Sequence, residues 1–229
     1  MPKHWLPLEA NPEILTAYAH RLGLSEKYAF HDVLSVEPWA LELVPTPVVA
    51  ILLLFPISEA SEAERVSTRS DQEATLYFMK QHIGNACGTI GVLHTLTNLH
   101  RVEGFQDLPP SDSYIGRLIT QTNTMNPDER GRWLEVDEEI ERAHVACGDL
   151  GQSEAQDEEV DTHFVAFVND GGKIYELDGR REGPILRGVI DTPEDFALRV
   201  LDTIRTNFME RNPEDIRFSI LALAPTPSD

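Results

Sequence analysis

The sequence predicts an α+β fold in which a central antiparallel β-sheet lies between helical layers. Apolar or alternating segments typical of strands are separated by blocks of segments with helical spacing. The expected strands are 48–55, 163–168, 173–178 and 218–223. The 229 residues are 41% hydrophobic and can bury a full core, and no repeat or change in composition marks a boundary. We therefore expect one domain, residues 1–229.

The N-terminal segment is expected to be an extended arm that leads into a helix. Asn11 can cap this helix, Pro12 suits its first position, and Gly23 can end it. The mixed segment 30–34 is a candidate strand, and a turn of helix is expected at 39–43.

The run Val48–Phe55 is apolar throughout and lies between prolines, as expected for a central strand buried on both faces. Residues 58–74 are small and charged, which suits either a solvated loop or a short exposed helix. Apolar spacing predicts further helices at about 86–99, 113–122, 127–143 and 193–210.

The clearest strand signal is a β-hairpin around Asn169-Asp-Gly-Gly172. With Asp170-Gly171 as a type I′ turn, residue 163 faces residue 178. His163 and Asp178 would then be directly opposed on one sheet face, with Cβ atoms about 5 Å apart. Such a pair can be purely structural, or its carboxylate can orient the imidazole for catalysis.

Cys87 is expected in the first turn of the helix at 86–99, with Asn85 as its N-cap. Free N–H groups and the helix dipole lower the pKa of a thiol at this position. Gly84 and Gly88 leave room for another backbone to approach. The competing interpretation is a buried cysteine with a structural role.

A thiol nucleophile needs a base, and the base needs an orienting group. We expect Cys87 to attack a carbonyl, His163 to hold the proton and pass it to the leaving group, and Asp178 to orient His163. The backbone N–H of Cys87 and the side-chain amide of Gln81 are the expected oxyanion donors. Cys147 has no base placed for it and is not expected to be catalytic.

Charge is the strongest signal in the composition: 19 Lys and Arg stand against 39 Asp and Glu, which gives a formal charge of −20. This charge disfavours nucleic acid as a partner and attracts a basic one, although acidity can also serve only solubility. Two cysteines make no disulfide framework, and the longest apolar run has eight residues. We expect a cytoplasmic monomer without membrane contact, metal or cofactor, with the nucleus as a second compartment left open.

Six segments together resemble the ubiquitin carboxyl-terminal hydrolases, papain-like thiol peptidases that cut after the C-terminal glycine of ubiquitin. The Asn-Ala-Cys-Gly-Thr block with its upstream Gln, and the Tyr-Glu-Leu-Asp-Gly-Arg block, are specific in combination. The matching segments are 5–13, 48–57, 78–91, 161–164, 175–180 and 208–218.

The resemblance implies that Cys87 is the nucleophile, His163 the base and acid, Asp178 the orienter and Gln81 the oxyanion donor. It also implies a knotted backbone and a crossover loop over the active site at about 148–162. Such a loop favours small or unfolded leaving groups. The family positions that contact ubiquitin, whose Arg-rich tail ends in Leu-Arg-Gly-Gly, correspond to Leu8, Glu9, Glu13, Asp32 and Asn85.

Two alternatives to a deubiquitinating hydrolase remain. The chain can be a ubiquitin-binding or ubiquitin-stabilising protein, although the intact catalytic set argues against a purely inactive binder. It can also be a hydrolase that prefers a ubiquitin-like modifier, which the sequence does not distinguish from the first hypothesis.

Overall fold

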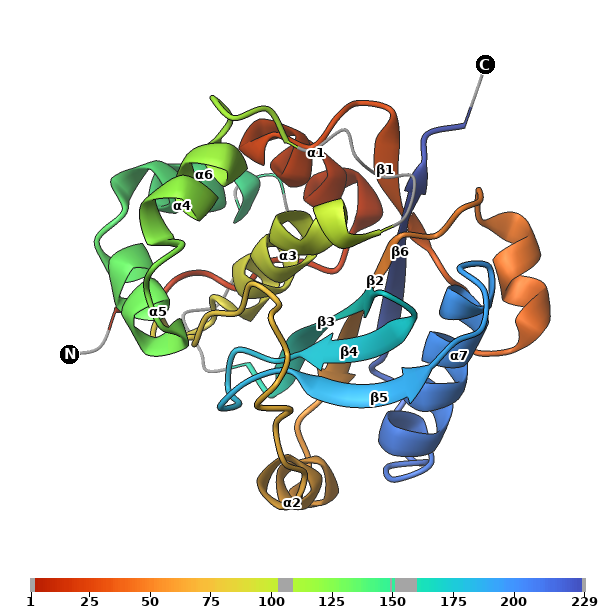
Figure 1. The fold of residues 1–229 in the computed structure, drawn as a ribbon. Coiled ribbons are helices and arrows are strands. Elements are labelled where there is room, and N and C mark those ends of the chain that lie inside the picture. Colours follow the sequence, from red (N-terminus) through yellow and green to blue (C-terminus); the bar gives the residue numbers. More distant parts are fainter. Residues whose placement is uncertain (1–2, 103–108, 149, 151–159, 228–229) are drawn as a thin grey trace.

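The computed structural model describes residues 3–102, 109–148, 150 and 160–227. Within these ranges, six strands form one antiparallel sheet in the order β1-β6-β2-β3-β4-β5 (Figure 1). The strands are β1 (Tyr28–Asp32), β2 (Ala50–Pro56), β3 (Thr162–Asp170), β4 (Lys173–Leu177), β5 (Ile185–Val189) and β6 (Ser219–Pro225).

The five strands expected from the sequence are confirmed, but β5 was not predicted. Its sequence, Ile-Leu-Arg-Gly-Val, contains a glycine and an arginine, and it pairs only with β4 at the sheet edge. Leu186 and Val189 are exposed, so the strand lacks the apolar run that identifies a buried strand.

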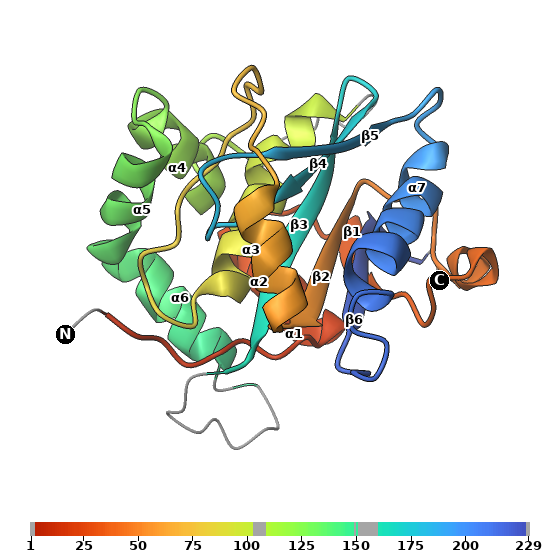
Figure 2. The ribbon, with the colours of Figure 1, turned by 90° about the horizontal axis from the view of Figure 1, so that it is seen from below.

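Helices cover both faces of the sheet, as the α+β prediction requires (Figures 1 and 2). One face carries α1 and α3–α6, whereas α7 and the 3₁₀ helix η1 pack on the other. The α-helices are α1 (Pro12–Leu22), α2 (Glu59–Ser67), α3 (Cys87–Asn98), α4 (Tyr114–Thr122), α5 (Pro127–Glu135), α6 (Glu138–Gly148) and α7 (Asp195–Ile204), and η1 is Pro38–Leu43.

Two helical predictions are corrected in detail. The single helix expected at 127–143 is divided into α5 and α6 at Val136 and Asp137, where Asp137 Oδ1 accepts bonds from the first N–H groups of α6. The helix expected at 193–210 leaves the α-helical pattern after Ile204 and continues as a π-helical turn, Arg205–Met209. Residues 59–67 take the helical alternative.

The central strand β2 joins the two halves of the core. Ala50 and Leu52 face the α3 layer, while Ile51 and Leu53 face the α7 layer, and all four are fully buried. All twelve residues of α3 are buried between the sheet and the surrounding helices. The first turn of α3 is therefore held rigidly against β2 and β3.

Much of the crossover loop expected at 148–162 lies outside the described residues. The knot implied by the family resemblance depends on the path through those residues and stays a prediction.

Candidate active site

Cys87 is the first residue of α3, as predicted, but its neighbour does not cap the helix. Asn85 has a φ of 59°, and Ala86 occupies the N-cap position without a side-chain bond. The expectation that Asn85 is the N-cap is therefore wrong. Without a capping side chain, the N–H groups of the first turn face the site directly, where they favour negative charge.

The N-terminal arm packs against the loop before Cys87. The backbone N–H of Trp5 donates to Gly84 O at 3.0 Å, and the Gly84 N–H donates to Lys3 O at 2.9 Å. A Cβ atom at Gly84 would collide with the His4 ring. The absence of a side chain at Gly84 thus allows the N-terminal arm to approach closely. This confirms the prediction that another backbone segment approaches here.

His163 and Asp178 meet in a buried hydrogen bond, with His163 Nε2 2.6 Å from Asp178 Oδ1. Their side chains are each 3% exposed. The same Asp178 oxygen accepts the backbone N–H of Arg180 at 2.8 Å, and Phe55 packs edge-on against the His163 ring. Both rotamers are therefore fixed by bonding and packing.

The predicted register of this hairpin is wrong by two residues. Asp170 pairs with Lys173 and Ala166 with Leu177, so the turn is Gly171-Gly172. Both glycines have positive φ, as a type I′ turn needs, at no steric cost. A shift of two residues keeps every side chain on its face, so His163 and Asp178 still meet, but diagonally.

The Cys87 thiol is hydrogen-bonded to the His163 side chain. Because Asp178 engages Nε2, Nδ1 is the ring nitrogen left to bond the sulfur. Burial alone would raise the pKa of Cys87, but the bond to His163 and its charge lower it. Burial would lower the pKa of His163, but Asp178 and then Cys87 raise it to about 9. The pair therefore favours a thiolate beside an imidazolium.

Asp178 stays ionised although it is buried. Burial opposes its charge, but the charge of His163, the bond to that ring and the Arg180 N–H lower the pKa of Asp178 to about 2. It can therefore accept the His163 N–H and stabilise an imidazolium at neutral pH.

Gln81 lies beside the loop that carries Asp178. Its backbone N–H donates to Gly179 O at 2.8 Å, and its side-chain Nε2 donates to Ile83 O at 3.1 Å. The Nε2 group has a second hydrogen that this bond does not use. The buried Oε1 atom has no partner within the described ranges. The amide is therefore held in place with one donor available.

A buried ion-pair cluster, which the sequence did not suggest, adjoins Asp178 at Oδ2, the carboxylate oxygen that does not bond His163. Arg181 Nε lies 3.3 Å from Glu176 Oε1 and 3.6 Å from Asp178 Oδ2, and its Nη2 pairs with Glu64. Arg187 Nη2 pairs with both Glu64 at 2.7 Å and Glu176 at 2.6 Å. We name Glu64, Glu176, Arg181 and Arg187 the ion-pair cluster.

Every side chain of the ion-pair cluster is at most 8% exposed. Burial raises the pKa of Glu176, although Arg187 and Arg181 counteract part of the shift. The one available signal in the sequence was a glutamate between Tyr175 and Leu177 in strand β4, because a charge among buried strand residues needs a partner.

The residues expected to contact a substrate do not all lie on one exposed surface. Glu13 and Asp32 are exposed and line a groove of about 640 Å³ between α1 and β1. Leu8 is buried and packs against Gly88, and Glu9 is half-buried. Leu8 thus contributes to the wall beside α3 rather than to an exposed surface.

Cys147, the other cysteine, is buried, and its surroundings differ from those of Cys87. Burial raises its pKa to about 11, with only a small opposing effect of Arg21, and its thiol faces the Ile14 carbonyl at 3.8 Å. The Cys147 thiol therefore stays protonated at neutral pH.

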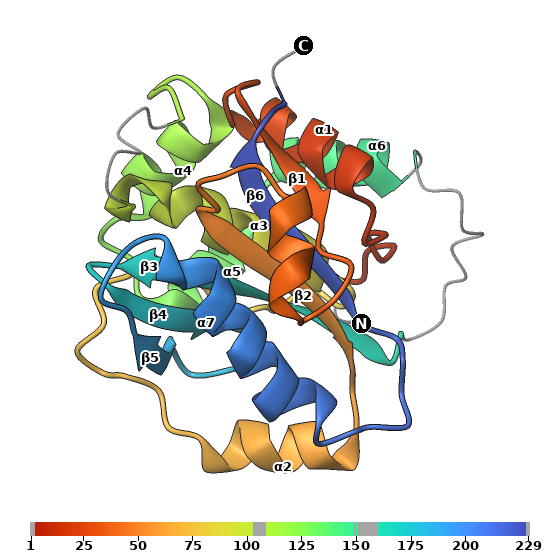
Figure 3. The same ribbon diagram turned by 90° about the vertical axis from the view of Figure 1, so that its right-hand side faces the viewer.

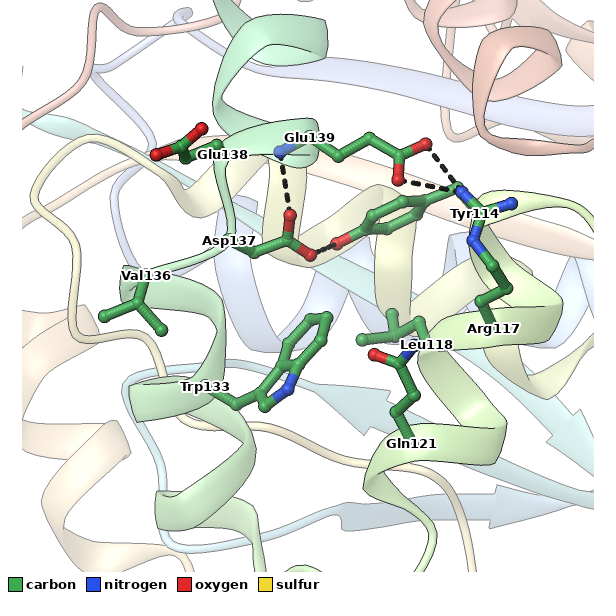
Figure 4. A pocket seen from close by; sticks show the side chains of 9 residues that line it. All are labelled: Tyr114, Arg117, Leu118, Gln121, Trp133, Val136, Asp137, Glu138 and Glu139. Atoms are coloured by element: carbon green, nitrogen blue, oxygen red, sulfur yellow. Dashed lines mark hydrogen bonds and ion pairs between the residues drawn. The ribbon is translucent and has the colours of Figure 1, made fainter.

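A cavity of about 360 Å³ between α4, α5 and α6 is lined by none of the four predicted catalytic residues (Figure 4). There Arg117 binds both carboxylate oxygens of Glu139, and Tyr114 donates to Asp137. These polar groups are thus hydrogen-bonded to one another.

No group of three or more potential metal ligands occurs among the described residues. In the same part of the chain, no helix has the length and apolar character needed to cross a membrane.

Comparison with known proteins agrees with this geometry. A family model described as "Ubiquitin carboxyl-terminal hydrolase, family 1" matches residues 5–210. A probable ubiquitin carboxyl-terminal hydrolase of Dictyostelium discoideum is 36% identical, over 99% of this chain and 90% of that protein. Human ubiquitin carboxyl-terminal hydrolase isozyme L1 is 38% identical, over 95% of this chain and 96% of that protein.

A solved structure shows the same fold. The catalytic domain of Trichinella spiralis UCH37, bound to ubiquitin vinyl methyl ester, superposes with a TM-score of 0.79 at 23% identity, over 98% of this chain and 96% of that one. The chain therefore belongs to ubiquitin carboxyl-terminal hydrolase family 1 and is a cysteine-type ubiquitinyl hydrolase.

Proposed function

We propose that residues 1–229 form a single catalytic domain that hydrolyses the bond after the C-terminal glycine of ubiquitin, with Cys87 as the nucleophile. The observation that carries this proposal is the buried contact of Cys87, His163 and Asp178 at the start of α3. We place the enzyme in the cytoplasm as a monomer, with the nucleus as a second compartment.

In the acylation step, the Cys87 thiolate forms a bond to the carbonyl carbon of the terminal glycine. The negative charge moves to the carbonyl oxygen, where the Cys87 backbone N–H and Gln81 Nε2 stabilise it. His163 gives its proton to the leaving amine, the C–N bond breaks, and a thioester remains.

In the second step, His163 takes a proton from water, and the resulting hydroxide attacks the thioester. The C–S bond breaks, and free ubiquitin and the Cys87 thiolate are restored. Asp178 holds the imidazole in one orientation and stabilises its charged form throughout.

The groove between α1 and β1 supports a role in binding the modifier. Glu13 and Asp32 lie on it beside the exposed apolar residues Leu34 and Leu43. Carboxylates at such a rim attract a basic partner. The crossover loop at about 148–162 would restrict the leaving group to small or unfolded chains. We assign Leu8, Glu9 and Asn85 to the same contact surface on the strength of the family positions.

The test is hydrolysis of ubiquitin that carries a fluorescent C-terminal amide. Turnover by the wild type should fall by about 10⁶-fold in Cys87→Ala. Cys147→Ala is the matched control and should retain turnover, because Cys147 has no base beside it.

Two further results separate the alternatives. An inactive wild type that still binds ubiquitin tightly would favour a binding or stabilising protein. Faster turnover of a ubiquitin-like modifier at equal concentration would change the preferred substrate but not the reaction.

A further inference from the structure

Four arginines line one pocket beside the catalytic loop. The pocket has a volume of about 430 Å³, lies between α2 and the segment after Asp178, and contains Arg65, Arg69, Arg180 and Arg181. Among the described residues, Glu182 is the one carboxylate in its lining. We name it the arginine pocket. Such a concentration of positive charge is unexpected in a chain with a formal charge of −20.

The nearby carboxylates do not neutralise this charge. Arg65 and Arg180 share the carboxylate of Glu62. Its Oε2 lies 2.9 Å from Arg65 Nη2, and its Oε1 lies 2.6 Å from Arg180 Nη2. Glu182 pairs with Lys80 outside the lining. Among the described residues, Arg69 is exposed and has no ion-pair or hydrogen-bond partner. Arg181 is already compensated within the ion-pair cluster. In the described part of the chain, the other three arginines have one acid between them, because Arg65 and Arg180 share Glu62 and Arg69 has none, which leaves excess positive charge.

The shared carboxylate also holds two guanidinium groups in place. The side chains of Arg65 and Arg180 are 29% and 27% exposed, so both are partly withdrawn from water. Arg180 uses Nη2 for Glu62, and its Nε and Nη1 have no acceptor within the described ranges. Planar guanidinium groups with free N–H donors bind carboxylate and phosphate oxygens in pairs.

The arginine pocket adjoins the catalytic residues on the side opposite the groove. The Arg180 backbone N–H donates to the same Asp178 oxygen that receives His163 Nε2. In the strand order, β1, which lines the groove, lies on the β2 side of β3, whereas Arg180 and Arg181 follow β4, the neighbour on the other side. The helix α3, which begins at Cys87, packs on β3. Figures 1 and 3 show α1 and β1 at the end of the molecule opposite α2.

We propose that the arginine pocket is a subsite for an anionic side chain in the leaving group, a carboxylate or a phosphate, carried by the peptide that follows the scissile bond. The inference rests on the proposed function, because ubiquitin bound in the groove would direct the leaving peptide past Cys87 toward α2. The acidic surface of this protein repels an acidic leaving peptide, whereas the arginine pocket attracts it.

The test uses ubiquitin extended by six residues of Gly and Ser, with one Ser replaced by Glu at each position in turn. The measured quantity is kcat/KM for each Glu peptide relative to the all-neutral peptide. At the position that reaches the arginine pocket, the wild type should prefer Glu by about fivefold, the range of a partly exposed ion pair. Phosphoserine at that position separates phosphate from carboxylate recognition, and Lys there should be disfavoured.

Arg69 is the residue to change, because it is exposed and its loss leaves no buried partner unpaired. Arg69→Glu should reverse the preference, Arg69→Gln should remove it, and Arg69→Lys should restore part of it. Arg199→Gln, on the exposed surface of α7, is the matched control and should keep the wild-type ratio.

Two results would overturn the subsite: equal kcat/KM for Glu and Ser at all six positions, or a Glu preference that is unchanged in Arg69→Glu. Cleavage of the neutral peptide in that experiment would leave the proposed function standing. A wild type that cleaves no extended ubiquitin would contradict the proposed function and this subsite together.

Discussion

His163 and Asp178 are not paired in the β3–β4 ladder, yet their side chains form a hydrogen bond of 2.6 Å. The contact is diagonal, and Asp178 lies one residue beyond the end of β4. Because Asp178 has left the strand, its other oxygen can face Arg181. This position connects the predicted catalytic pair to the ion-pair cluster.

The charge of Asp178 should determine the alkaline limit of activity. The pKa of His163 is raised to about 9, so the imidazolium that protonates the leaving amine is lost as the pH rises through about 9. Asp178→Asn removes the negative charge that raises the pKa of His163, whereas burial still lowers that pKa. The alkaline limb of kcat/KM should therefore move to lower pH. The rate should also fall roughly 10⁴-fold. The check is a pH–rate profile of both proteins, and an unmoved limb would show that Asp178 does not control His163.

Arg181 should be a positioning residue for Asp178. Arg181→Met leaves Glu64, Glu176 and Asp178 with less compensation, which should cost about 3–5 kcal/mol of unfolding free energy. It should also lower kcat, and it should raise the alkaline limit because one positive charge near His163 is removed. Denaturant unfolding and a pH–rate profile measure the two effects.

Arg187→Met is the matched control for Arg181. It breaks the same ion-pair cluster but has no contact with Asp178. It should lose comparable stability while the alkaline limit stays in place. Identical kinetic changes in both variants would reduce the role of Arg181 to folding alone.

Gln81 should act in the transition state rather than in substrate binding. Gln81→Ala removes the free Nε2 donor and should lower kcat by about 10²- to 10³-fold with little change in KM. Gln121→Ala, an exposed glutamine of α4, is the control. A rise in KM at constant kcat would assign Gln81 to substrate binding instead.

Charge at the groove should affect the association rate of ubiquitin. Glu13→Lys and Asp32→Lys should each slow association about two- to tenfold at low salt, and the difference should shrink as salt screens the charges. Stopped-flow binding with the Cys87→Ala background measures this rate without turnover. Asp191→Lys makes the same change in charge outside the groove lining, so equal slowing in that variant would indicate an effect of net charge alone.

Local patterns were sufficient for much of the fold. The apolar run at 48–55 identified a strand buried on both faces, and the glycine-rich turn identified the hairpin. Helical spacing after Cys87 placed its thiol at the start of a helix. The needs of a thiol nucleophile predicted the roles of Cys87, His163, Asp178 and Gln81, and the family resemblance implied the same roles. The strand, the turn and the helix start each depend on residues within a few positions of one another, where backbone geometry restricts the alternatives.

The folded structure was needed to show which charged groups surround the catalytic residues. Glu64 of α2 and Arg187 of β5 are 123 residues apart, and their side chains meet only in the folded chain. The edge strand β5, the diagonal contact of His163 with Asp178, and the approach of Gln81 to Gly179 likewise have no local signature. A buried charge requires a partner but does not specify which one. The strand pattern alone placed Glu176 in the hairpin, and packing of the segments that follow β4 brings its partners Arg181 and Arg187 into place.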